Sequence, residues 1–448
     1  MVETIIALLQ YLHVCDNGHE VFHVTGTFSN PSQLGCLLAV SAIMLSGLLM
    51  QQAKGWRRMI AIIVLCLQIT VLIVTGSRAA ILSLIVGCIP VLSNRYRFKI
   101  PYLPLLLALL LLVSGLYSIR PSSANGRLLI WRISAEMFLD KPLFGFGFYG
   151  FQKNYLLYQA EFLKTRMDSS WANIADNVAF PYNEYIHILI DFGLVGLLTF
   201  VFILWTALKN TKSEESVGNI FKYALLTFSV FAFFSYPLYT FRLNLLFWMI
   251  CICLLLSSRK MKPGNVLSCF IIIISIGMNT YCAFQERIFE NRIKSLSSQS
   301  DTERADAKLY LNANYEEMKR YPFVFDLYMQ ELVQNQEADS LKIFEALNIC
   351  PSTHLYCNAG DFCLENGNIA EAEHSYMTAY WMAPKYLTAK YKLFLLYFRT
   401  NDYCKARKIG SEILSASYKI RNTQTLRMLA DVQSKLKDLP HPSLSRMW

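Results

Sequence analysis

The stretch MIAIIVLCLQITVLIVTGSRAAILSLIVGCIPVL, residues 59–92, contains two apolar runs separated by a short polar turn. Met59–Val74 and Ile81–Leu92 are each predicted to cross a membrane as a helix. Arg78 lies in the turn between them. A charged side chain between two closely spaced spans is energetically costly, so we take it as a candidate functional residue. Its permanent charge and planar fork of donors suit phosphate oxygens. The alternative is an arginine at a helix end that reaches lipid headgroups.

The composition predicts a membrane domain in the first part of the chain. Of the 448 residues, 54% are hydrophobic, the mean hydropathy is +0.32, and the apolar excess is confined to residues 1–284. We expect spans near 33–50, 59–75, 79–92, 100–118, 187–208, 220–238, 242–257 and 265–284. Residues 1–12 resemble the end of another span. The total is therefore eight to nine, and the chain is interpreted as an N-terminally shortened form.

The net charge of +10 comes from loops between these spans, which argues against a nucleic-acid-binding protein. The basic residues fall in alternate loops: Lys54, Arg57, Arg58; Arg95, Arg97, Lys99; Lys209, Lys212, Lys222; and Arg259, Lys260, Lys262. The positive-inside rule makes that side cytoplasmic. Arg78, Arg242, the long 119–186 loop and the region after residue 284 are then expected on the exterior side.

Residues 285–448 are polar and helix-forming, which predicts a separate soluble domain. Ala338, Ala372 and Ala406 are 34 residues apart, the period of tetratricopeptide helix pairs. The alternative is a helical bundle with a chance periodicity. The sequence thus predicts an all-α protein, with a polytopic membrane bundle over residues 1–284 and a TPR-like repeat domain over residues 285–448 that could bind a protein partner.

Polar clusters on the predicted exterior side are the candidates for a site. Residues 25–31, Thr-Gly-Thr-Phe-Ser-Asn-Pro, have the composition of a turn and helix cap. Arg127 and Arg132 flank Trp131, which, with Ile133 and Met137, is expected to hold a helix at the membrane surface. Two arginines there suit a diphosphate. The alternative is a pair of solvated arginines on an interfacial helix.

Two more features lie close to the predicted span 187–208. Gly145 and Gly147 form a Gly-x-Gly outside any nucleotide-binding context. Glu184, His187 and Asp191 have the i, i+3, i+7 spacing of one helical face, which would point into a cavity. These groups are able to bind a ligand or serve as acid and base; the alternative is an interfacial belt of tyrosines with an N-cap. No metal-ligand spacing, nucleophile elbow or soluble nucleotide site is apparent.

Taken in order, these motifs resemble the O-antigen ligase family of the O-antigen ligase and polymerase superfamily. The matching residues are Gly26 to Pro31, Thr75 to Arg78, Gly126-Arg127 with Trp131, Pro142 to Gly147, and Asn183-Glu184-Tyr185 with Gly193 and Gly196. The resemblance covers about residues 10–260. It implies a GT-C-type membrane glycosyltransferase in the bacterial inner membrane, with the C-terminal domain in the periplasm.

The resemblance also implies the substrates and their contacts. The donor would be a glycan on undecaprenyl diphosphate, and the acceptor a hydroxyl on lipid A core, another glycan or a protein. Preorganised arginines would stabilise the diphosphate leaving group, with no metal or other cofactor required. The candidate catalytic residues are Arg78, Arg127, Tyr182, Asn183 and Glu184. The candidate substrate-binding residues are Asn30, Arg132, Gly145, Gly147, His187, Asp191 and Arg242.

One position departs from the family pattern. Lipopolysaccharide ligases of this family usually carry a histidine just before the Asn matched to Asn183, and Tyr182 stands there instead. The unperturbed pKa of a tyrosine hydroxyl is about 10, so tyrosine is a poor base at neutral pH. Either Glu184, His187 or Asp191 is the base, or Tyr182 only orients the acceptor. The alternatives to a ligase are a polymerase of repeat units, a membrane-anchored scaffold, and a transporter.

Overall fold

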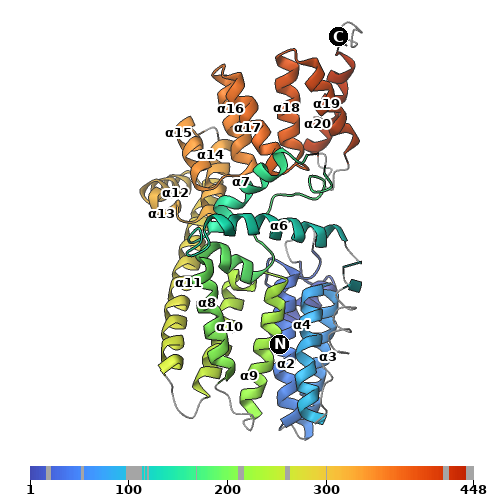
Figure 1. Ribbon diagram of the computed structural model, residues 1–448, viewed down its shortest axis with the longest axis vertical. Helices are drawn as coiled ribbons and strands as arrows, with labels where there is room; N and C mark the ends of the chain where they lie inside the picture. Colours follow the sequence, from blue (N-terminus) through green and yellow to red (C-terminus); the bar gives the residue numbers. More distant parts are fainter. Residues whose placement is uncertain are drawn as a thin grey trace. The chain divides into compact units, whose positions relative to one another are not determined.

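The computed structural model of the chain is all-α in the residues that it describes (Figure 1). These are residues 1–16, 22–51, 55–96, 114–115, 117–118, 121–167, 169–209, 216–257, 263–298, 300–335, 337–416 and 423–439. The predicted span 100–118 lies almost wholly outside them.

The chain divides into two compact units, which we describe separately. Unit 1 comprises residues 1–121, 141–147 and 180–285, and unit 2 comprises residues 122–140, 148–179 and 286–448. Most of the long 119–186 loop therefore belongs with the C-terminal helices, whereas the sequence placed it in the membrane domain.

Unit 1 contains the apolar helices. They are α1 (Val2–Tyr11), α2 (Pro31–Gln51), α3 (Gly55–Val74), α4 (Arg78–Tyr96), α8 (Glu184–Lys209), α9 (Ser216–Phe233), the short 3-10 helix η1 (Pro237–Tyr239), α10 (Phe241–Leu256) and most of α11 (Pro263–Leu296). Among the described residues, α2, α3, α8 and α11 have apolar stretches long enough to cross a membrane. The chain is thus a membrane protein with several candidate spans.

Three predicted spans correspond to shorter apolar helices. The apolar stretches Arg78–Asn94 in α4, Gly218–Phe233 in α9 and Phe241–Leu256 in α10 are 10–17 residues long, shorter than the roughly 20 residues of a typical span. The predicted span 220–238 ends early because α9 stops at Phe233 and Pro237 begins η1. Proline lacks the N–H that a continuing helix needs.

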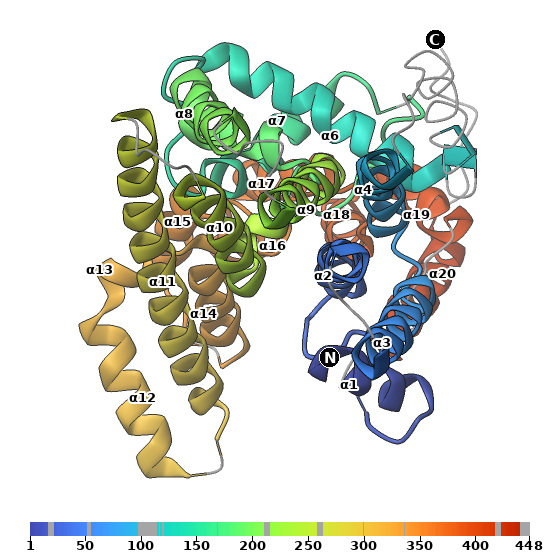
Figure 2. The same ribbon diagram turned by 90° about the horizontal axis from the view of Figure 1, so that it is seen from below.

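Small residues allow the central helices of unit 1 to pack closely. Helix α2 contacts α3, α4 and α9, and α4 also packs on α9 (Figure 2). A Cβ added at Gly35 would lie 2.8 Å from the Cβ of Ala80, and one at Gly87 would overlap the hydroxyl of Thr227. Such small residues at helix contacts are typical of membrane bundles. Lipid provides no hydrophobic driving force between helices, so their association depends on close van der Waals packing.

Unit 2 combines two helices that precede α8 in the chain with the helices that follow α11. They are α6 (Pro121–Asp140), α7 (Gly150–Lys164), α12 (Asp301–Ala313), α13 (Tyr315–Met318), α14 (Pro322–Gln334), α15 (Ser340–Ile349), α16 (Thr353–Glu365), α17 (Ile369–Met382), α18 (Leu387–Arg399), α19 (Tyr403–Ser415) and α20 (Thr423–Lys437). Neighbours along the chain pack in pairs, notably α16 with α17 and α18 with α19, and α7 packs on α17 (Figure 1).

The 34-residue period holds for two of these pairs. Asn368 and Asp402 cap α17 and α19, and Ala372 and Ala406 are the fully buried fourth residues of those helices. Ala338 is not equivalent, because it precedes Asp339, the N-cap of α15, and Ile343 takes the fourth position. The sequence match at Ala338 is therefore a coincidence of spacing, and the α14–α15 pair has a different register.

Candidate functional site

The bend between α3 and α4 places Arg78 at the first position of α4. Gly76, with φ of 63°, ends the turn after α3, and the side chain of Ser77 accepts a 3.4 Å hydrogen bond from the N–H of Ala80. The hydroxyls of Ser77 and Ser32 lie 3.1 Å apart and join this turn to the start of α2. The guanidinium of the half-buried Arg78 thus adds to the positive end of a helix dipole, which favours an anion.

The segment 25–31 forms the turn that the sequence predicts, and Asn30 caps α2. The Oδ1 of Asn30 accepts a 2.8 Å hydrogen bond from the N–H of Ser32. The side chain of Gln10 on α1 both accepts from Gly26 N–H at 2.8 Å and donates to the Gly26 carbonyl at 2.8 Å. This turn is therefore held in place by α1.

Arg242, at the start of α10, also contacts this turn. Its Nη1 lies 3.3 Å from Oε1 of Glu3 and hydrogen-bonds the hydroxyl of Thr27, and its guanidinium lies over the ring of Phe28. Glu3 in turn accepts a 3.0 Å hydrogen bond from the N–H of Thr27. The charge of Arg242 is thus balanced within the protein.

Two of the candidate catalytic residues, Tyr182 and Asn183, form the start of α8. Tyr182 has a left-handed φ of 52°, and Asn183 follows it as the N-cap. The Oδ1 of Asn183 accepts hydrogen bonds from the N–H groups of Tyr185 at 3.0 Å and Ile186 at 3.1 Å. These hydrogen bonds are typical of an N-cap asparagine, and they fix Glu184 as the first residue of the helix.

Glu184, His187 and Asp191 lie together on one face of α8, as their spacing predicts. Nδ1 of His187 is 3.7 Å from Oε1 of Glu184, and Nε2 is 3.6 Å from Oδ2 of Asp191. Glu184 and Asp191 are 3% and 6% exposed, so two buried carboxylates flank one imidazole. The second oxygen of Glu184, Oε2, has no hydrogen-bond partner among the described residues. A buried acceptor without a partner is costly, so a hydrogen-bond donor beside this oxygen would be stabilising.

Aromatic rings cover this cluster. Phe180 stacks on Tyr236 with centroids 4.3 Å apart and meets His187 edge to face at 6.3 Å. Tyr182 packs edge to face on the same Tyr236 at 5.5 Å. Because Tyr236 immediately precedes η1 and α10, these rings join the start of α8 to the start of α10. Together with the Ser32–Ser77 and Thr27–Arg242 contacts, they gather the starts of α2, α4, α8 and α10 at one end of unit 1.

Helix α8 is broken at Gly193, which has φ of 65° and ψ of −163°. The loop Pro142–Gly147 fills the break. The N–H groups of Phe146 and Gly147 donate to the carbonyls of Ile190 at 2.9 Å and Asp191 at 2.8 Å. In return, Leu194 and Val195 donate to the carbonyls of Pro142 at 2.8 Å and Leu143 at 3.2 Å. Non-helical backbone inside a membrane protein needs such partners.

Two glycines are required by this backbone pairing. A Cβ at Gly145 would lie 2.4 Å from the carbonyl oxygen of Ile190, and one at Gly193 would lie 2.3 Å from that of Leu143. Gly147 has φ of 85° and open space around it. The sequence singled out Gly145, Gly147 and Gly193, but it did not predict that the two segments pair. Backbone hydrogen bonds between distant segments place no constraint on the side chains other than the need for these glycines.

Arg127 and Arg132 lie on α6 in unit 2. Arg127 is half-buried, and the guanidinium of the exposed Arg132 lies 5.8 Å from the ring centroid of Phe162 on α7. Ile133 and Met137 are fully buried, so they pack inside the protein rather than holding α6 at a membrane surface. In the part of the chain that the structure describes, no group of three or more His, Cys, Asp or Glu side chains is arranged to hold a metal ion.

Comparison with known proteins finds a similarity for part of the chain. Residues 63–201 match the O-antigen ligase family. The matched segment begins within α3 and ends within α8, so it contains Arg78, Arg127, the Pro142–Gly147 loop and the Glu184–His187–Asp191 cluster. No curated protein and no solved structure matches the chain. Residues 63–201 of this membrane protein are therefore similar to the O-antigen ligase family.

Proposed function

We propose that the protein is a GT-C-type membrane glycosyltransferase, which transfers a glycan from undecaprenyl diphosphate to an acceptor hydroxyl on the periplasmic face of a bacterial inner membrane. The family of residues 63–201 and the four membrane-length helices support a role in lipid-linked glycan transfer. The acceptor is proposed to be lipid A core or a protein, with a second lipid-linked glycan, as in a polymerase, as the alternative.

The observation that carries the proposal is the buried Glu184–His187–Asp191 cluster. Both nitrogens of His187 face carboxylates, so the protonated ring, with an N–H on each nitrogen, would hold and orient both carboxylates and has no lone pair left to accept a further proton. Oε1 of Glu184 faces His187, whereas the buried Oε2 has no partner among the described residues and is able to accept a hydrogen from an acceptor hydroxyl. We therefore assign Glu184 as the general base, with His187 and Asp191 as positioning residues. This assignment leaves Tyr182 to orient the acceptor.

Arg78 is proposed to bind the diphosphate of the donor. It stands at the N-terminus of α4, where its guanidinium and the first backbone N–H groups of the helix favour the same anion. Arg127 is proposed to contribute a second cation, on the resemblance of Gly126-Arg127 to the family motif. Binding the leaving group more tightly as its charge grows lowers the barrier.

The reaction is a displacement at the anomeric carbon of the first sugar. The acceptor oxygen forms a bond to that carbon while its proton passes to Oε2 of Glu184. The bond between the anomeric carbon and the phosphate oxygen breaks, and its electron pair leaves with undecaprenyl diphosphate. The proton then returns to solvent or to the diphosphate, so that charge and atoms balance.

The C-terminal helices are proposed to be TPR-like and periplasmic. The period of 34 residues between the caps of α17 and α19 supports the repeat assignment. The basic loops, predicted to be cytoplasmic, support the orientation.

The test is deletion of the gene followed by complementation. Total lipopolysaccharide and periplasmic glycoproteins are separated on gels and stained for carbohydrate. Loss of the long-chain ladder above an intact core band, restored by the wild-type gene, supports ligation, and loss of glycoprotein bands alone supports a protein acceptor. A ladder reduced to one repeat unit on the core supports the polymerase alternative. Unchanged bands in both fractions would contradict the proposal.

A further inference from the structure

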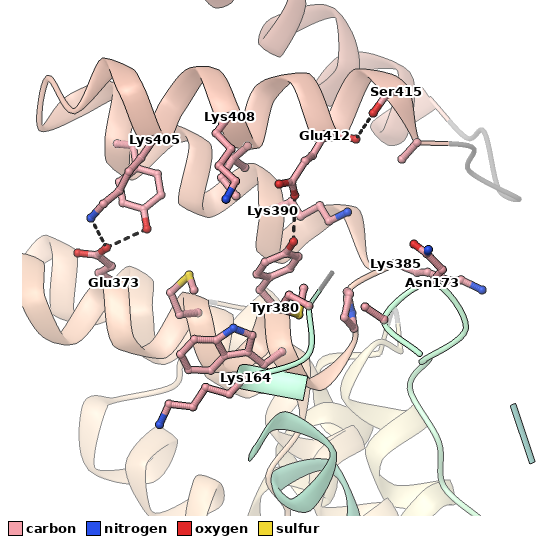
Figure 3. A pocket seen from close by; sticks show the side chains of 18 residues that line it. Lys164, Asn173, Glu373, Tyr380, Lys385, Lys390, Lys405, Lys408, Glu412 and Ser415 are labelled. Carbon is pink, nitrogen blue, oxygen red and sulfur yellow. Dashed lines mark hydrogen bonds and ion pairs between the residues drawn. The ribbon is translucent and has the colours of Figure 1, made fainter. Parts of the chain in front are cut away.

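A large pocket in unit 2 is separate from the residues proposed for transfer. It has a volume of about 880 Å³ and lies between α17, α18, α19, the end of α7 and the turn after it (Figure 3). That volume is in the range of ligand-binding sites in proteins. Every lining residue belongs to unit 2.

The pocket is rich in lysines whose charges are only partly balanced. Its lining contains Lys164, Lys385, Lys390, Lys405 and Lys408 against two acidic residues, Glu373 and Glu412. Both glutamates are already engaged. Glu373 accepts from Lys405 at 2.9 Å and from the hydroxyl of Tyr397 at 2.8 Å, and Glu412 accepts from the hydroxyl of Tyr380 at 2.9 Å.

Three of these lysines form no ion pair with a described residue. Lys385, Lys390 and Lys408 have no carboxylate within ion-pair distance in the described part of the chain. Figure 3 shows the ammonium group of Lys408 extending from α19 toward the hollow. Lys390 is only 9% exposed, and its burial lowers the pKa of its ammonium group despite the opposing charge of Glu412. A buried cation of this kind is stabilised when an anion binds beside it.

The rest of the lining is apolar. Trp381, Met167, Met377 and Ile409 present rings and aliphatic groups to the hollow. Uncharged hydrogen-bonding side chains are few. The tyrosine hydroxyls donate to the two glutamates and the Ser415 hydroxyl donates to the Glu412 carbonyl, which leaves the amide of Asn173 and the indole N–H of Trp381. A carbohydrate would bring many hydroxyl hydrogens that need acceptors, and both carboxylates of the lining are already engaged, so its burial here is costly. A peptide with acidic and apolar side chains would satisfy both the lysines and the apolar surface.

We propose that this pocket binds an acidic peptide segment of a partner protein, with carboxylates paired to Lys385, Lys390 and Lys408 and an apolar side chain placed against Trp381. Helical repeats commonly offer such concave surfaces to peptides. The proposal goes beyond glycan transfer and does not rest on it, because no residue of the Glu184 cluster or of the Arg78 turn lines the pocket.

The test measures peptide binding to the full-length protein in detergent micelles by fluorescence anisotropy. The probe is a fluorescein-labelled hexapeptide that alternates Glu and Leu. Its matched control alternates Gln and Leu, and empty micelles report partitioning into detergent. Unlabelled hexagalacturonate serves as a competitor that carries carboxylates on a carbohydrate.

The variant for the pocket carries Lys385→Gln and Lys408→Gln, at exposed positions where we expect the substitutions to leave folding intact. The matched control carries Lys342→Gln and Lys437→Gln, which lie outside the pocket. We expect saturable binding of the acidic peptide that weakens with salt and becomes roughly tenfold weaker in the pocket variant. The control variant should bind like the wild type, and hexagalacturonate should compete poorly.

Three results would overturn the proposal. One is equal affinity of the pocket variant and its control for the acidic peptide. The second is equal affinity of the wild type for the Glu–Leu and Gln–Leu peptides. The third is lysine-dependent binding of hexagalacturonate without binding of the peptide, which would assign the pocket to an acidic carbohydrate.

Discussion

The backbone N–H of Gly147 donates a 2.8 Å hydrogen bond to the carbonyl oxygen of Asp191, the residue whose side chain faces Nε2 of His187. This bond joins the Pro142–Gly147 loop to the break in α8. The loop therefore positions the C-terminal end of the proposed catalytic face, while Asn183 caps its N-terminal end. Both ends of the Glu184–His187–Asp191 cluster are thus fixed by hydrogen bonds.

The pairing at the helix break makes Gly193 a structural requirement. A Cβ there would overlap the Leu143 carbonyl, and its φ and ψ lie in a region that only glycine adopts readily. We expect Gly193→Ala to destabilise the protein by more than about 2 kcal/mol. The measurement is the thermal midpoint in detergent, read by retention of the monodisperse peak after heating.

The control for this prediction is Gly277→Ala in α11, where an added Cβ meets nothing within 4 Å. That change should be neutral or stabilise by up to about 1 kcal/mol, because alanine is the better helix former. A Gly193→Ala protein with the thermal midpoint of the wild type would show that the loop and the helix break are not paired as described.

Arg78 is expected to act in donor binding rather than in folding. Arg78→Ala should lower the rate of glycan transfer by about 100-fold or more at normal protein level, because one cation for the leaving group is lost. Arg78→Lys should recover only part of the rate, since an ammonium group lacks the planar fork. Arg287→Ala, at an exposed position of α11, is the matched control. Wild-type surface glycan in cells with Arg78→Ala would show that this arginine only reaches lipid headgroups.

Tyr182 is expected to be dispensable as an acid–base group. Tyr182→Phe keeps the ring that packs on Tyr236 and removes only the hydroxyl. We expect the transfer rate to stay within about tenfold of the wild type, because a phenol that ionises near pH 10 contributes little as a base at neutral pH. A rate that vanishes while donor binding persists would assign the proton transfer to Tyr182.

Arg242 is predicted to act through the 25–31 turn. Because it pairs with Glu3 and Thr27, Arg242→Ala and Glu3→Ala should have similar effects on activity, and the double variant should be no worse than either one. The exposed ion pair itself should contribute less than about 1 kcal/mol to stability. An activity loss for Arg242→Ala that far exceeds that for Glu3→Ala would instead support direct contact between Arg242 and the substrate.

Several features were predictable because they depend on local sequence. Apolar runs predict α2, α3, α8 and α11, and the i, i+3, i+7 spacing places Glu184, His187 and Asp191 on one face. Other features depend on distant contacts. The burial of Ile133 and Met137, the pairing of Arg242 with Glu3, and the fit of the Pro142–Gly147 loop into the helix break join segments far apart in the chain. A spacing rule within one segment does not contain that information.

The most direct measurement is transfer by the purified protein from a defined glycan on undecaprenyl diphosphate to a defined acceptor, comparing the wild type with Glu184→Gln. Glu161→Gln, an exposed carboxylate on α7, is the matched control. Loss of the general base should slow turnover by about 100- to 10,000-fold while donor binding remains. If Glu184→Gln turns over at the wild-type rate, the buried cluster on α8 is not the acid–base site and the central claim is wrong.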